Sequence, residues 1–254
     1  MKSSVTVIMP YYKKRRFVLS SFKSFANQEF KDKNLIIIYD DKDKKDLIYL
    51  KKITKNYKNV RILVNEKNLG AGESRNRALK ISRSDYIAFL DSDDLWRPGK
   101  LKAQISFMKK NSINISHTSY KIIDWKGRIS GYRKAAAKLN YGNLIKSCDI
   151  GLSTVIIKRS FLKSSKFSNL KTKEDYVLWL KLSKKDNFYG LDKPYTEWRN
   201  LDNSLSSSTF QKISDAFKVY YFYEKFSMIK STLMVLRLSF FYFIKTIPMI
   251  NDKK

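Results

Sequence analysis

Residues 86–94 read YIAFLDSDD, and this stretch decides the fold of the chain. Its first five residues are apolar or aromatic, which is typical of a strand buried in a parallel sheet. Three aspartates within four residues follow at once. In open α/β sheets, ligands bind beyond the carboxyl ends of the strands. The stretch therefore predicts a central strand that ends at a polar site.

The same order of strand and helix recurs on the N-terminal side of this stretch. Apolar runs at residues 5–9, 35–39 and 60–64 predict three more buried strands. Val18, Phe22 and Phe25 recur at helical spacing and predict a helix after the first strand. A second helix is expected over residues 72–81. Alternating strands and helices predict an α/β fold, with an open, mainly parallel, Rossmann-like sheet flanked by helices.

The pattern changes on the C-terminal side. We expect helices over residues 99–111 and 174–182, strands over residues 113–120, 122–125 and 154–158, and an irregular segment over residues 132–150. One domain over residues 1–210 is the simplest organisation, followed by a basic amphipathic helical tail over residues 211–254.

The tail has two interpretations of about equal weight. Lys230, Arg237 and Lys245 fall within one arc of a helix drawn through residues 226–250. Such a helix suits the surface of an anionic membrane. It suits equally well a helix that covers the apolar surface of its own domain.

The chain is strongly basic. Its 254 residues include 52 Lys and Arg against 23 Asp and Glu, a formal net charge of +29. A hydrophobic content of 43% excludes a disordered polybasic chain. The charge attracts anions such as phosphorylated molecules, nucleic acid or anionic lipid, but the preference for lysine also matches an A+T-biased genome. No zinc-finger, RRM or KH pattern is present, so no specific nucleic-acid partner is expected.

The sequence also bears on the compartment. Cys148 is the one cysteine, so no intrachain disulfide can form, and the first residues lack the pattern of a signal peptide. We expect a cytoplasmic protein. No uncharged apolar stretch reaches the roughly 18–20 residues of a transmembrane helix.

Acidic residues are scarce and clustered, and each cluster has two interpretations. Asp91, Asp93 and Asp94 predict a divalent metal site if Asp91 and Asp93 point the same way from a strand, or else a solvated helix-capping turn. Glu174 and Asp175 open a helix, where they favour the helix dipole or supply a general base. The pair at residues 40–41 repeats the strand-end arrangement after the second predicted strand, or it is only part of a charged loop.

Two further segments lie at strand or helix ends. An aromatic pair at residues 11–12 offers a face for a base to stack on, or ordinary core packing. Small residues at 68–72 open a helix, where backbone amides can approach a phosphate. Neither a dinucleotide-binding glycine pattern nor a P-loop is present, which argues against a nicotinamide dehydrogenase and a P-loop NTPase.

Taken together, these segments resemble the family 2 glycosyltransferases of the GT-A fold, of the type that builds bacterial cell-surface polysaccharide and lipopolysaccharide. The resemblance runs from Val5 to about Ser206. It rests on ordered motifs at residues 5–12, 24–28, 37–41, 68–70 with 74–76, 86–101, 174–175, and 198–199 with 204–206.

The resemblance implies an inverting transfer of a sugar from a nucleotide-sugar, most often a UDP-sugar, to a hydroxyl of a saccharide or lipid-linked saccharide. A divalent cation, Mn²⁺ or Mg²⁺, is implied with it, and so is a peripheral location at the inner face of the cytoplasmic membrane. The implied nucleotide-sugar residues are Pro10, Tyr12, Asp41, Arg75, Asp91 and Asp94. The other implied roles are Asp93 as metal ligand, Asp175 as catalytic base, Glu174, Trp179 and Arg199 as acceptor or support residues, and Arg199 with Arg75 as diphosphate contacts.

Three positions depart from the family pattern. Lys42 follows the first acidic pair where the family has Gly, Lys13 stands in place of Asn, and Leu201 in place of His. The alternatives are a basic nucleic-acid-binding protein and a sugar-nucleotide-binding relative with impaired catalysis. A nucleotidyltransferase is disfavoured because residues 11–16 contain no glycine.

Overall fold

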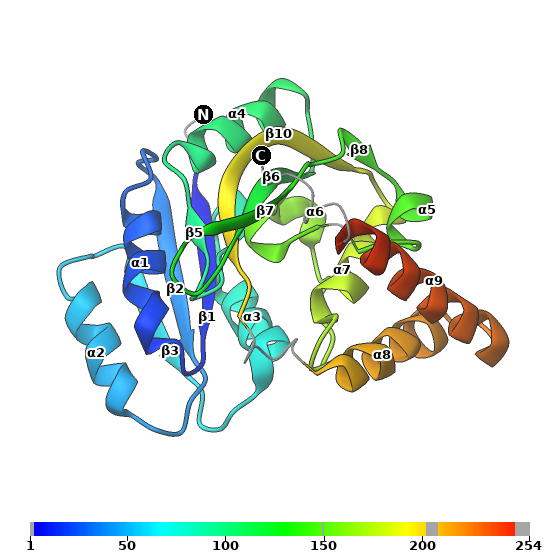
Figure 1. The fold of residues 1–254 in the computed structure, drawn as a ribbon. Coiled ribbons are helices and arrows are strands. Elements are labelled where there is room, and N and C mark those ends of the chain that lie inside the picture. The colour runs from blue at the N-terminus through cyan, green and yellow to red at the C-terminus, as the bar shows by residue number, and fades with distance from the viewer. Residues whose placement is uncertain (1–2, 149, 202–207, 247–254) are drawn as a thin grey trace.

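The computed structural model describes residues 3–148, 150–201 and 208–246 (Figure 1). Its ten strands form one mixed sheet in the order β3-β2-β1-β4-β9-β6-β10-β5, with β7 paired to β6 and β8 to β10. The strands are β1 (Val5–Tyr11), β2 (Lys33–Tyr39), β3 (Val60–Val64), β4 (Tyr86–Phe89), β5 (Leu95–Trp96), β6 (Ile115–Ile123), β7 (Ile129–Arg133), β8 (Lys138–Leu139), β9 (Ile156–Lys158) and β10 (Phe188–Arg199). The first four are mutually parallel, as the sequence predicts.

Helices cover both faces of this sheet (Figure 1). They are α1 (Arg15–Ala26), α2 (Lys45–Thr54), α3 (Gly70–Ile81), α4 (Lys100–Lys110), α5 (Tyr141–Leu144), α6 (Arg159–Leu162), α7 (Glu174–Ser183), α8 (Thr209–Lys218) and α9 (Met228–Thr246), with a 3-10 turn η1 (Leu152–Thr154) and a π-helical turn η2 (Val219–Tyr223). Successive strand residues point to opposite faces, so β2 sends Ile37 to the core under α1, α2 and α4. Ile36 and Ile38 instead join the core under α3 and α7.

Several elements differ from the sequence-based expectation. Residues 113–125 hold one long strand, β6, instead of two, and β9 is short and runs antiparallel to β4. The segment expected to be irregular contains β8 and α5. β10 is not predicted from the sequence, because Gly190, Asp192 and Pro194 interrupt its apolar pattern.

The C-terminal helices pack on the rest of the chain with one face and expose the other. Val219, Tyr220 and Leu238 belong to the same core cluster as Phe89 and Trp179. Of the expected arc of basic residues, the structure describes the side chains of Lys230 and Arg237 but not that of Lys245. Residues 247–254, and the expected motif at residues 204–206, also lie outside the described residues. Within the described chain, no helix is long and apolar enough to cross a membrane.

Candidate active site

The acidic residues at the end of β4 form a turn and not a strand. β4 ends at Phe89, and the amide of Asp94 donates to the carbonyl of Asp91 at 3.1 Å. The expectation that Asp91 and Asp93 point the same way from a strand is therefore wrong, because neither residue lies in a strand. Each of the three carboxylates instead has its own partner.

Ser153 holds two members of this turn. Its hydroxyl donates to Oδ2 of Asp94 at 2.5 Å and accepts the amide of Asp91 at 3.1 Å. Burial, with the charges of Asp93 and Asp91 nearby, raises the pKa of Asp94 well above its ordinary value. Sequence reasoning missed Ser153, which lies 59 residues from Asp94 in a segment without any motif.

Arg199 braces the same turn from the end of β10. Its amide donates to Oδ1 of Asp94 at 2.8 Å, and its Nε donates to the carbonyl of Asp93 at 2.9 Å. A terminal guanidinium nitrogen donates to the carbonyl of Asp124 at 2.7 Å. The Arg199 side chain, expected to contact an acceptor or a diphosphate, thus donates to main-chain carbonyls of the protein.

Asp93 is the member of the turn that the sequence resemblance implies as a metal ligand. Its carboxylate pairs with Nζ of Lys14 at 2.8 Å, and burial raises its pKa despite that lysine. Among the residues described, no three Asp, Glu, His or Cys side chains gather into a metal site. Mg²⁺ and similar cations are commonly held by one or two carboxylates and substrate phosphates, and this donor set fits that kind of site.

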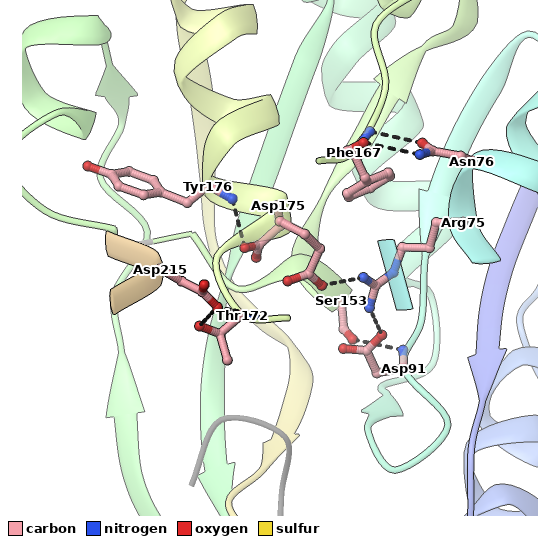
Figure 2. Close-up of polar contacts among 10 residues, drawn as sticks. Arg75, Asn76, Asp91, Ser153, Phe167, Thr172, Asp175, Tyr176 and Asp215 are labelled. Carbon is pink, nitrogen blue, oxygen red and sulfur yellow. Dashed lines mark hydrogen bonds and ion pairs between the residues drawn. The ribbon is translucent and has the colours of Figure 1, made fainter. Parts of the chain in front are cut away.

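A buried arginine links the turn to α7. Arg75, on α3, donates to Asp91 and to Glu174, each at 2.7 Å, and its side chain is only 4% exposed (Figure 2). Burial, opposed by Arg75 and reinforced by the charge of Asp175, raises the pKa of Glu174 to about 7. The structure therefore joins two acidic clusters that lie far apart in the sequence.

Asp175 lies beside this bridge at the start of α7 (Figure 2). Its carboxylate accepts the amide of Tyr176 at 2.7 Å. Burial raises the pKa of Asp175 above its ordinary value, against the lowering influence of Arg75 and Lys173. A half-buried carboxylate with a raised pKa is suited to act as a general base.

Two contacts with α3 set how close α7 can come. A Cβ on Gly72 would stand 2.5 Å from the carbonyl oxygen of Ser168 and 3.2 Å from Cγ of Glu174. The side-chain amide of Asn76 bonds both the amide and the carbonyl of Phe167, at 2.9 and 3.1 Å (Figure 2). The loop before α7 is thereby held against α3.

The expected nucleotide-side residues lie at the ends of β1 and β2, which are neighbours in the sheet. Pro10 and Tyr12 are half-buried and Asp41 is 7% exposed. Tyr11 is fully buried and stacks on Tyr39, so of the aromatic pair only Tyr12 can face a ligand. Lys42, which departs from the family pattern, is exposed.

Two backbone amides in the segment expected to approach a phosphate, residues 68–72, already have a partner within the protein. The amides of Leu69 and Gly70 donate to the carboxylate of Asp40 at 2.7 and 2.8 Å. Asp40 thus satisfies two of the amides at the start of α3.

Trp179 cannot contact an acceptor. It is fully buried, with its ring against Phe89, Phe167 and Phe188. Trp179 packs in the core beneath α7. Of the two roles expected for it, acceptor contact and support, only support is compatible with this position.

These features have a counterpart among known proteins. The family described as Glycosyl transferase family 2 matches residues 6–170, more than half of the 254-residue chain. The chain is a family 2 glycosyltransferase. The resemblance drawn from the sequence motifs is confirmed.

Two curated relatives cover most of this glycosyltransferase. The UDP-Glc:alpha-D-GlcNAc-diphosphoundecaprenol beta-1,3-glucosyltransferase WfgD of Escherichia coli is 35% identical over 211 residues, 82% of each protein. The putative teichuronic acid biosynthesis glycosyltransferase TuaG of Bacillus subtilis is 31% identical over 233 residues, 91% of this chain and 92% of TuaG.

Solved structures confirm the predicted GT-A fold of this glycosyltransferase. TarS of S. aureus, solved with UDP-GlcNAc, has a TM-score of 0.70 at 20% identity, with 91% of this chain and 70% of the TarS chain covered. The mannosyltransferase PcManGT of Pyrobaculum calidifontis, solved with GDP-Man and Mn²⁺, has a TM-score of 0.67 at 10% identity, with 93% and 70% covered.

Proposed function

We propose that this glycosyltransferase moves a sugar from a UDP-sugar to a hydroxyl of a lipid-linked saccharide in cell-surface glycan synthesis, with inversion at the anomeric carbon. The observation that carries the proposal is the Asp91–Arg75–Glu174 bridge, with Asp175 beside it at the carboxyl edge of the sheet. The WfgD name supports the donor and acceptor classes, and the bound UDP-GlcNAc of TarS supports a uridine nucleotide.

The donor occupies the end of the sheet at β1, β2 and β4. Pro10, Tyr12 and Asp41 receive the base, and Asp91 and Asp94 hold the nucleotide-sugar. Asp93 is the residue that would hold Mn²⁺ or Mg²⁺ together with the diphosphate. When bound, such a cation neutralises the charge that grows on the departing diphosphate.

Asp175 removes the proton from the acceptor hydroxyl. The hydroxyl oxygen then attacks the anomeric carbon from the face opposite the diphosphate, and the bond to the diphosphate breaks in the same displacement. One base is sufficient, and no covalent sugar–enzyme intermediate forms.

Arg75 has two roles in this arrangement. It neutralises Asp91 on the donor side and Glu174 beside the base, so it fixes the distance between the two halves of the site. Glu174 in turn supports the acceptor. Arg199 keeps the acidic turn in shape through its main-chain contacts.

The donor assignment is tested by UDP release. We expect one member of a panel of UDP-sugars to release UDP with Mn²⁺ and a polyprenyl-diphosphate-linked N-acetylhexosamine, and EDTA to abolish the reaction. Asp93→Asn should mimic EDTA, because it removes the carboxylate offered to the cation, whereas Glu66→Gln, at an exposed acid after β3, should not. Failure with every donor, together with tight binding of nucleic acid, would favour the basic nucleic-acid-binding alternative.

We also propose that α8, η2 and α9 bind the surface of an anionic membrane, where a lipid-linked acceptor is found. Figure 1 shows α8 and α9 at the opposite end of the molecule from α1 and α2, and the two helices are in contact. Their exposed apolar residues are Phe210, Ile213, Phe222, Met228, Ile229, Leu233, Leu236 and Phe240. Between the two helices lies a groove of about 430 Å³.

The charges around this face complement anionic lipid. Residues 209–241 carry five basic side chains and two acids. Asp215 is fully buried, and the Glu224 side chain is 5% exposed and paired with Lys184. The exposed charge of the segment is therefore positive, as at interfacial amphipathic helices.

Flotation on liposomes tests this surface. We expect the protein to float with vesicles containing phosphatidylglycerol, less at high salt, and to lose roughly tenfold of this binding in Ile229→Glu. Ile48→Glu is the matched control, because Ile48 is equally exposed, at 71%, but lies on α2. Equal flotation of all three proteins would contradict the proposal.

A further inference from the structure

Asp215 is a fully buried acid on α8, outside the acidic clusters of the site. Its Oδ2 accepts the amide of Thr172 at 2.9 Å, the hydroxyl of Thr172 at 3.0 Å and Nε2 of Gln211 at 2.9 Å. Its Oδ1 accepts Nζ of Lys218 at 3.2 Å. Figure 2 shows Asp215 and Thr172 paired near the start of α7. A buried carboxylate with this many donors forms a strong connection between α8 and the loop before α7, which we call a joint.

A second joint lies on the other side of the acidic pair. The hydroxyls of Tyr176 and Tyr220 are 3.2 Å apart, and their rings pack edge to face. The two hydroxyls also bond the carbonyls of Leu144 and Ile145, at 2.7 and 3.1 Å. Thr172 and Tyr176, which flank the pair formed by residues 174 and 175, are thus both fastened to the segment of residues 209–223.

These joints matter because few other contacts hold the Asp175 side chain in position. Its carboxylate accepts the amide of its own neighbour, Tyr176. No side chain donates to that carboxylate among the residues that the structure describes. Its position is therefore set by the backbone at the start of α7, which Lys173 begins in a left-handed conformation with φ of 65°.

We infer that Asp215 is a positioning residue for the Glu174–Asp175 pair, acting through Thr172. The C-terminal helix α8 is then part of the support of the active site. The inference rests on the proposed role of Asp175 as base. A displacement of about 1 Å of a catalytic group can lower a rate by about 100-fold. Loss of the contact at Thr172, three residues before Asp175, is therefore expected to have a measurable effect.

Substitutions on both sides of the joint test the inference in the full-length protein. Asp215→Asn removes the negative charge and replaces one of the two acceptor oxygens by an amide donor, so it cannot serve both Thr172 and Lys218 as acceptor, and Thr172→Val removes the hydroxyl. We expect kcat to fall by about 10- to 100-fold in each, with the Kd for UDP and Mn²⁺ within about twofold of the parent protein. Thr172→Ser, which keeps the hydroxyl, should restore kcat.

The matched control is Thr54→Val. Thr54 is a buried threonine on α2 whose hydroxyl donates to the carbonyl of Leu50 at 2.8 Å, remote from the site. Its loss should lower Tm as Thr172→Val does but leave kcat unchanged. If Asp215→Asn fails to fold, the Thr172 series carries the test by itself.

A double-mutant cycle distinguishes positioning from general damage. In Asp175→Asn, adding Asp215→Asn should change the residual rate by less than about twofold, because there is no base left to misplace. Fully additive losses, or an unchanged kcat in both Asp215→Asn and Thr172→Val, would overturn the inference. Full activity of Asp175→Asn alone would instead refute the proposed base.

Discussion

Replacing Asp175 by asparagine is expected to lower kcat by about 10²–10⁴-fold while leaving the affinity for UDP and Mn²⁺ nearly unchanged. Asparagine keeps the shape of the side chain and can still accept the amide of Tyr176, but it cannot take a proton. The donor contacts proposed for residues 91–94 lie on a different segment. Steady-state kinetics with the accepted donor, together with calorimetric titration of UDP, measure the two quantities separately.

The pH dependence gives the same prediction a second readout. A base works as the carboxylate, so kcat/KM, which reports the groups of the free enzyme, should rise with pH through the pKa of Asp175. Because burial raises that pKa, half-maximal kcat/KM should lie above pH 3.8, the ordinary value of the pKa. The residual kcat/KM of Asp175→Asn should lack this rise. Wild-type turnover by Asp175→Asn, or a kcat/KM that falls as pH rises through this range, would remove Asp175 from the mechanism.

Much of the fold could be predicted from the sequence because four of its strands are continuous apolar runs, three of them, β1, β2 and β4, largely buried. The runs at residues 5–9, 35–39, 60–64 and 86–90 are almost entirely apolar, and each corresponds to a parallel strand. β10 escaped because most of its residues are only half-buried, so polar side chains and Pro194 are tolerated along it. A continuous apolar run marks a strand even where it is half-buried, as in β3, whereas β10 has no such run.

The acidic positions could be predicted for a similar reason, but their partners could not. Strand and helix ends gather at the carboxyl edge of the sheet whatever the loop lengths, so Asp91 and Glu174 were found. The partners arise from tertiary packing across long separations. Ser153 lies 59 residues from Asp94, and Thr172 lies 43 residues from Asp215. Lys14 could not be distinguished among 52 basic residues.

Replacing Arg75 by methionine should be the most damaging single change outside the base. Its guanidinium is 4% exposed and pairs with Asp91 and Glu174, whose side chains are 30% and 13% exposed. Removing one partner of a buried ion pair leaves uncompensated charge and costs about 3–5 kcal/mol. We expect a loss of that size in the free energy of unfolding, measured in urea, and a large loss of transfer in the protein that remains folded.

The charge argument separates Arg75 from an ordinary buried side chain. Arg75→Lys should recover only part of the loss, because an ammonium group cannot make the two-pronged contact of a guanidinium. Arg75→Met/Glu174→Gln should regain part of the stability without regaining activity. It removes the more buried of the two stranded carboxylates but not the need to hold α7 beside Asp91. Arg61→Met, at an exposed arginine on β3, should change stability by no more than about 0.5 kcal/mol. If Arg75→Met were as stable as Arg61→Met and still active, the bridge would be incidental, and the two halves of the site would have to be held together by the contacts of Gly72 and Asn76 with the loop before α7.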